Sequence, residues 1–122
     1  MTNVDAIQKA IEAHTGWKAR LRTAVSGGVF EVPAATVKLD NQCEFGRWLY
    51  GTEIASADKQ TEHYRTAKRL HAQFHLEAAK VVEWATSGQK QKAEEALGLE
   101  GGYTKISREL TQEMIKWRES LR

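Results

Sequence analysis

The feature that most constrains this chain is an apolar repeat, with steps of three and four residues, that recurs in three long segments. Such a repeat places its side chains on one face of an α-helix, and that face must be covered by other helices. The segments are residues 4–25, 59–86 and 103–121. The repeat positions are Ile7, Ile11, His14, Trp17, Leu21 and Val25; Tyr64, Ala67, His71, Phe74, Ala78, Val81 and Ala85; and Ile106, Leu110, Met114, Trp117 and Leu121. The pattern predicts an all-α fold, an antiparallel bundle of the four-helix type.

Shorter elements are expected to connect the long helices. The first helix ends at a Ser-Gly-Gly sequence, and residues 29–39, which include the single proline, are predicted to form an ordered loop. We predict a short helix over residues 42–50, capped by Asp40 or Asn41, with Cys43 in its first turn. A second short helix is expected over residues 89–97. The bundle therefore gains an extra short helix that carries Cys43.

Length and composition indicate one globular domain that spans residues 1–122. Hydrophobic residues make up 41% of the chain and charged residues 28%, and no run of about 20 apolar residues could cross a bilayer. No signal peptide is recognisable, and a lone cysteine fits a reducing compartment, so we expect a cytoplasmic protein without membrane insertion. The net charge of +2 comes from acids and bases scattered along the chain, which disfavours nucleic-acid binding.

The chain holds one cysteine and four histidines. Cys43 has no intramolecular disulfide partner and needs another role. His71 and His75 stand at positions i and i+4 of one predicted helix and share a face, and His14 and His71 both lie on apolar stripes. A buried imidazole without a partner costs about 1–3 kcal/mol, and one metal ion would satisfy several of them. The sequence therefore predicts a tetrahedral Zn²⁺ site with His14, Cys43, His71 and His75 as ligands.

The fourth histidine, His63, is not expected to join this site. It precedes His71 by eight residues, which corresponds to a rotation of about 80° around the helix. We predict that it is a solvated surface residue.

No catalytic residue is predicted, because four protein ligands leave zinc no open position for a water molecule. A zinc peptidase of the HExxH type would need a glutamate directly after His71, where Ala72 stands. One alternative is an iron-based, hemerythrin-like bundle for oxygen binding or redox chemistry, which would need further histidines and bridging carboxylates. Haem held by one histidine is another alternative, but it would leave Cys43 without a role.

The predicted helix start around Cys43 would suit a thiolate. Free backbone N–H groups and the positive end of the helix dipole stabilise a negative sulfur. Gly46 would permit a close backbone approach. The aromatic residues of the segment are expected to pin it to its neighbours, and Trp48 to shield the thiolate from solvent.

Three short stretches resemble the chemoreceptor zinc-binding domain family, abbreviated CZB, which occurs in bacterial chemoreceptors and diguanylate cyclases. They are His14-Thr-Gly-Trp17, Cys43-Glu-Phe-Gly-Arg-Trp-Leu-Tyr50 and His71-Ala-Gln-Phe-His75, and the resemblance covers nearly the whole chain. It places the family's zinc ligands on the same four residues. It implies a helical homodimer with one zinc ion per subunit, whose occupancy controls a signalling module in chemotaxis or cyclic-di-GMP synthesis. It also implies that Cys43 can respond to oxidants such as hypochlorous acid.

These expectations combine into a hypothesis of regulation. Zinc would tie the first helix, the cysteine helix and the third helix together, and Cys43 would be the movable ligand because its short helix has the least other anchoring. Oxidation of its sulfur or loss of zinc would then release that helix. No output module fits within 122 residues, so the expected partner is a signalling output domain, met by a stand-alone protein or within a longer receptor. The competing hypothesis is a purely structural zinc ion that senses nothing.

Overall fold

The computed structural model describes residues 2–122, and this part of the chain contains helices and no strand. The helices are α1 (Asn3–Gly27), α2 (Ala34–Val37), α3 (Glu44–Tyr50), the 3₁₀ turn η1 (Asp58–Gln60), α4 (Glu62–Thr86), α5 (Lys90–Leu97) and α6 (Gly102–Ser120). The predicted all-α class is confirmed. The three long helices lie where the apolar repeats predicted them, within a few residues at each end.

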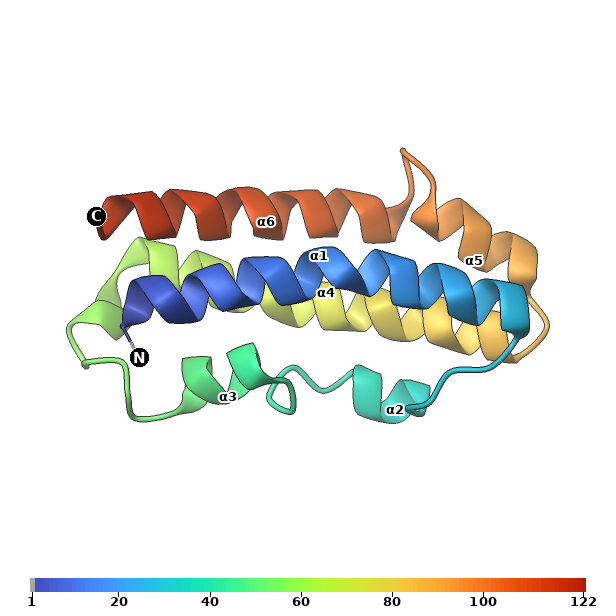
Figure 1. The fold of residues 1–122 in the computed structure, drawn as a ribbon, viewed down its shortest axis with the longest axis horizontal. Coiled ribbons are helices and arrows are strands. Elements are labelled where there is room, and N and C mark those ends of the chain that lie inside the picture. Colours follow the sequence, from blue (N-terminus) through green and yellow to red (C-terminus); the bar gives the residue numbers. More distant parts are fainter. Residues whose placement is uncertain (1) are drawn as a thin grey trace.

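The helices form an elongated bundle in which successive segments reverse direction. In Figure 1, α1 and α4 run parallel to each other along the long axis of the bundle. α6 packs against both helices and runs in the opposite direction. Between α1 and α4 the chain returns along the bundle through two short helices, α2 and α3, which are joined by irregular chain. We call this returning segment the α2–α3 leg. The α2–α3 leg lies along one side of the bundle, where α2 contacts α4 and α3 contacts α1. This is the expected four-helix-type arrangement with one broken member.

Local signals explain the ends of α1. Thr2 and Asp5 form a capping box, since the Asp5 N–H donates to Thr2 Oγ1 at 3.1 Å and the Thr2 N–H donates to the Asp5 carboxylate at 3.4 Å. The helix stops at Gly28, whose left-handed φ of 73° is readily adopted by a residue without a Cβ. Its N–H donates to the Ala24 carbonyl at 2.7 Å. The chain can then turn sharply into the α2–α3 leg.

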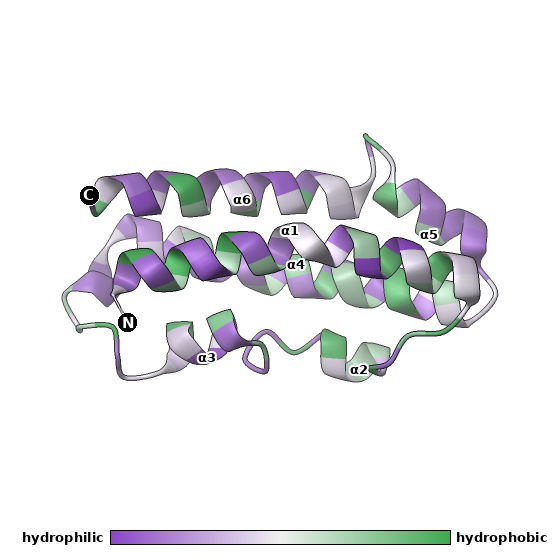
Figure 2. Ribbon diagram, in the orientation of Figure 1, coloured by the Kyte–Doolittle hydropathy of each residue, from purple (hydrophilic) through white to green (hydrophobic). Residues whose placement is uncertain are grey.

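The core is built from the apolar stripes. Figure 2 shows hydrophobic and hydrophilic residues alternating in short steps along α1, α4 and α6. Ile7, Leu21, Phe74, Leu110 and Met114 are fully buried, and burial of such side chains is the main stabilising term, about 1.5–3 kcal/mol each. None of the helices formed by residues 2–122 is long and apolar enough to span a membrane.

Two expected boundaries differ from the structure. Residues 34–37, expected to be loop, form the single turn α2, which follows Pro33 in an extended conformation and begins with two alanines. The third long helix begins at Glu62 and not at residue 59, because Thr61 caps it by accepting a hydrogen bond from the Tyr64 N–H at 3.3 Å. Residues 58–60 form η1 immediately before this cap.

Candidate metal centre

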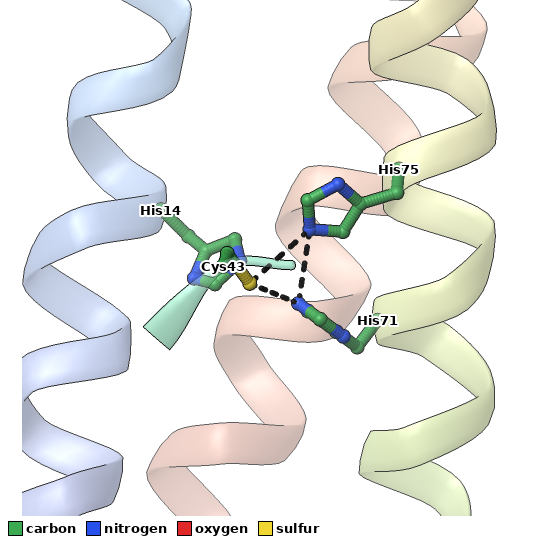
Figure 3. Close-up of side chains that lie close together, drawn as sticks. All are labelled: His14, Cys43, His71 and His75. Atoms are coloured by element: carbon green, nitrogen blue, oxygen red, sulfur yellow. Dashed lines mark hydrogen bonds between the residues drawn. The ribbon is translucent and has the colours of Figure 1, made fainter. Parts of the chain in front are cut away.

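Four side chains from different elements of the bundle lie close together (Figure 3). His14 comes from α1, Cys43 from the residue that precedes α3, and His71 and His75 from adjacent turns of α4. One nitrogen of each imidazole and the Cys43 sulfur all lie within 4.8 Å of one another. We call this group the four-donor cluster. It contains each residue that the sequence predicted for the site.

The distances that join the donor atoms of Cys43, His71 and His75 are close to those around a tetrahedral zinc ion. Cys43 Sγ lies 3.3 Å from His71 Nε2 and 3.5 Å from His75 Nε2, and the two Nε2 atoms are 3.1 Å apart. Zinc bonds of about 2.0–2.1 Å to nitrogen and 2.3 Å to sulfur place tetrahedral donors about 3.3–3.6 Å from each other. The donor set, three imidazoles and a thiol, is also one that zinc accepts.

Backbone carbonyl groups orient two of the three imidazoles. His14 Nδ1 donates to the Ala10 carbonyl one turn earlier at 2.8 Å, and His75 Nδ1 donates to the Val37 carbonyl at the end of α2 at 2.9 Å. Each bond turns the Nε2 atom of the same ring toward the cluster. His14 Nε2 has no hydrogen-bond partner among the described residues, and an unpaired buried acceptor of this kind suits a metal ligand.

Cys43 is itself the N-cap of α3, so the predicted cap at Asp40 or Asn41 and the predicted helix start at residue 42 are wrong: the helix begins at Glu44 because the Cys43 sulfur takes the capping role. Cys43 Sγ accepts a hydrogen bond from the Gly46 N–H at 3.3 Å. The predicted close approach at Gly46 is present, because a Cβ atom built there would lie 1.9 Å from the Asp40 carbonyl oxygen. The chain just before Cys43 therefore rests directly on α3. A second bond, from the Tyr50 hydroxyl to the Asp40 carboxylate at 2.6 Å, holds it there.

Burial governs the charge state of the cluster. The exposed fractions of His14, His71 and His75 are 3%, 0% and 2%. Burial lowers the pKa of His14 to about 4 and that of His71 to about 2, and it also lowers the pKa of His75. All three rings are therefore neutral near pH 7, the form that binds metal.

The expected stabilisation of the Cys43 thiolate is outweighed by burial. Desolvation raises the pKa of the thiol, and the backbone N–H groups at the start of α3 and the Arg47 charge oppose this shift only in part. The thiol is therefore protonated at neutral pH when no cation is near. A divalent cation in the cluster would reverse this balance, because it strongly favours the thiolate.

Acidification is expected to destabilise the metal-free protein. An unfolded histidine has a pKa of about 6.5, whereas His14 and His71 have lowered values, so below pH 6.5 the unfolded state binds more protons. The two imidazoles contribute fully to the free energy of unfolding above pH 6.5, and this contribution is lost as the pH falls toward their folded pKa values. At pH 5 the loss is about 2 kcal/mol per imidazole. Urea unfolding with a chelator at pH 7 and pH 5 measures it. An unchanged unfolding free energy would contradict the burial of neutral imidazoles.

Aromatic rings enclose the cluster. Phe45 and Phe74 pack edge-on against His14, with ring centroids 5.8 and 4.9 Å away. Trp48 stacks on Phe45 at 5.7 Å and lines the same cavity of about 310 Å³ as Cys43. The rings lower the local polarity and strengthen any charge interaction made inside the cluster.

His63 lies outside the cluster, as the helical phase predicted. It is not simply solvated, because its Nδ1 lies 3.0 Å from a carboxylate oxygen of Glu113 on α6. The four-donor cluster includes no carboxylate, whereas a hemerythrin-like di-iron site needs carboxylate bridges. The donors therefore favour the zinc alternative over the iron one.

Comparison with protein families agrees with this chemistry. The family model of the chemoreceptor zinc-binding domain matches residues 14–82, more than half of the chain. The chain belongs to this family. All four members of the cluster fall within the matched region of the CZB domain, which begins at His14 itself. No curated protein and no solved structure matches the chain.

Sequence reasoning missed the groups that orient the cluster. The Ala10 and Val37 carbonyls and the Gly46 N–H are main-chain groups, which every non-proline residue carries. The spacing of His14 and Ala10 within one helix could have suggested the first of them. Nothing in the sequence marked Val37, because its contact with His75 depends on where α2 rests against α4.

Proposed function

We propose that this CZB domain is a zinc-dependent regulatory sensor whose ligands are His14, Cys43, His71 and His75. The observation that carries the proposal is the convergence of three Nε2 atoms and one sulfur in a buried site. The domain has no catalytic role of its own in this proposal, since zinc would be fully coordinated by protein. Its occupancy would control a signalling output of the chemoreceptor or diguanylate cyclase type.

Bound zinc would supply a cross-link between segments that are far apart in sequence. Its ligands stand on α1, on α4 and at the end of the α2–α3 connection. The protein's own contribution is to hold neutral imidazoles in place through the Ala10 and Val37 carbonyls and to bury them among aromatic rings. The domain would act as a single unit over residues 1–122.

We propose that the element that moves on zinc release is the segment before Cys43 and not α3, the helix after it. The sequence-based expectation was that the cysteine helix has the least anchoring, but Phe45, Trp48 and Leu49 of α3 are all buried. In residues 28–42, by contrast, Val37 is the only buried residue. This segment also carries the carbonyl that orients His75. We therefore propose that residues 28–42, which we call the strap, loosen when zinc leaves.

Hydrogen exchange distinguishes a sensor from a permanent structural zinc site. The strap has protectable amides in α2, where the Val37 and Lys38 N–H groups donate to Pro33 and Ala34. On zinc removal we expect these amides to exchange at least about tenfold faster while the centres of α1 and α4 stay protected. Uniform protection in both states would instead favour the structural alternative.

Metal analysis tests the proposal as a whole. The purified protein should hold close to one equivalent of zinc per chain, and it should be colourless. His63→Ala, which changes the histidine outside the cluster, should leave the zinc content unchanged. Less than about half an equivalent after zinc is added would overturn the proposal. Iron with visible absorption would favour the hemerythrin-like alternative.

Cys43 is also proposed as the redox-responsive ligand. It is half-buried, and the cavity that it lines offers a small oxidant a path to the sulfur. A sulfur oxidised beyond the thiolate is a poor zinc ligand, so oxidants such as hypochlorous acid would release the strap as zinc removal does. As in the family, we propose a cytoplasmic homodimer that acts on a signalling partner and binds no nucleic acid.

A further inference from the structure

A groove of about 760 Å³ lies along the exposed face of α4, between α2 and α6. Leu76 stands in this groove with 42% of its surface exposed, and Ala34, Ala35 and Ile106 add further apolar side chains. An exposed apolar surface that is rimmed by polar residues is typical of a contact with another protein. The groove is therefore a candidate interface.

The charged side chains of the groove are balanced in sign. They are three lysines and three glutamates: Lys38, Lys80, Lys105, Glu77, Glu83 and Glu109. A partner of a single charge sign, such as nucleic acid or an anionic lipid surface, would meet as many like charges as opposite ones. A surface that carries both signs can instead match a second copy of itself, which is what a dimer with two-fold symmetry requires.

The exposed stripe of α4 carries opposite charges at equal distances from Leu76. Arg69 lies seven residues before Leu76, and Glu83 lies seven residues after it. Seven residues are close to two helical turns, or about 10 Å, so all three side chains share one face. Arg69 and Glu83 are both exposed, and neither forms an ion pair within residues 2–122.

This spacing selects one direction of pairing between two copies of α4. If the helices cross antiparallel at Leu76, Arg69 of each copy lies opposite Glu83 of the other. Lys80 then lies near Gln73 of the second copy, whose amide oxygen can accept a hydrogen bond from an ammonium group. A parallel pairing would set Arg69 against Arg69 and Glu83 against Glu83, and like charges repel.

We propose that α4 pairs antiparallel with α4 of a second copy of this chain, with Leu76 at the two-fold axis. Burial of the two leucines supplies the affinity, because exposed ion pairs contribute little. The two Arg69–Glu83 pairs fix the antiparallel direction. The inference rests on the proposed function, since it specifies the contact surface of the homodimer.

Sedimentation equilibrium of the zinc-loaded full chain measures the dissociation constant of the dimer. Leu76→Glu should weaken dimerisation at least about 30-fold, because it replaces two apolar side chains at the axis with two carboxylates. Leu99→Glu is the matched control, since Leu99 is 82% exposed in the α5–α6 connection and lies outside the groove. It should leave the dissociation constant within about twofold of the parent value.

Charge reversal tests the direction of pairing. Arg69→Glu sets like charges together in both pairs, and so does Glu83→Arg, so each should weaken dimerisation at least about tenfold. The double variant restores both pairs with their signs exchanged, and its dissociation constant should return to within about threefold of the parent value. Both side chains are exposed, so the variants should keep the helical circular dichroism spectrum of the parent.

The possible results separate the interface from the rest of the proposed function. A parent chain that stays monomeric at about 1 mM would overturn both the interface and the homodimer. A dimer that Leu76→Glu leaves intact, or that Leu99→Glu weakens equally, would overturn the α4 interface alone. A double charge variant that binds no better than the single variants would overturn the antiparallel pairing. Zinc content below about half an equivalent in the same samples would overturn the metal sensor and not the interface.

Discussion

Replacing Cys43 by serine is expected to weaken zinc binding by at least about 100-fold. The hydroxyl of serine stays protonated at neutral pH and is a harder donor than a thiolate. The substitution is otherwise mild, because serine is a favoured N-cap and its oxygen can still accept the Gly46 N–H that Cys43 Sγ accepts now. The loss of affinity should therefore report on the ligand and not on the fold. Competition with a chromophoric chelator measures it.

His63→Ala is the matched control for this experiment. His63 pairs with Glu113 and lies outside the four-donor cluster, so zinc affinity should stay within about twofold of the parent value. A loss of less than about tenfold in Cys43→Ser would show that sulfur is not a ligand. In that case three imidazoles would have to hold the ion with a water molecule, which is the coordination of a catalytic zinc site.

Gly46→Ala is expected to damage both the fold and the metal site. The new Cβ would lie 1.9 Å from the carbonyl oxygen of Asp40 and 2.8 Å from its carbonyl carbon. These are backbone atoms, and the Tyr50 hydroxyl holds the same residue through its carboxylate, so the chain before Cys43 must shift as a whole. We expect a destabilisation of about 1–3 kcal/mol. Zinc affinity should fall about 10–100-fold, because the thiol moves with the displaced chain.

Gly16→Ala supplies the control for this substitution. Gly16 lies inside α1, and a Cβ atom there meets nothing within 4 Å. The change should raise stability by about 0.5–1 kcal/mol through a lower entropy of the unfolded chain. Urea unfolding with a chelator, followed by zinc titration, separates the two effects. Equal stabilities for the two variants would show that the strap does not rest on Gly46 in solution.

The sequence carried most of the information about the long helices and the four donors. Apolar steps of three and four residues located α1, α4 and α6, and the same phase put His14 and His71 on buried faces and turned His63 away. The positions of the long helices and the orientation of the histidines were both predictable because both depend on helical geometry, which repeats along the chain. The spacing of His71 and His75 needed no tertiary knowledge.

The features that sequence reasoning missed are tertiary in origin. The turn α2 was expected to be loop, because one turn gives no measurable repeat. The anchoring of α3 was underestimated, since Trp48 stacks on Phe45 and also packs near Trp117 from α6, whose ring lies 5.6 Å away. The helix start at Cys43 suggested a thiolate, but burial raises the pKa of the thiol. Burial depends on neighbours that no local pattern names.

The packing of α6 has a consequence for the thermodynamics of metal uptake. It contacts both α1 and α4, yet it contributes none of the four donors. The helices that carry the three imidazoles are therefore held together by apolar contacts that exist without any ion. Much of the conformational entropy that the chain must lose to bring the ligands together is therefore lost during folding and not during metal binding. A zinc finger differs, because it folds only when its metal binds. The three long helices can therefore keep the imidazoles close together when no ion is bound, while the strap loosens as we propose.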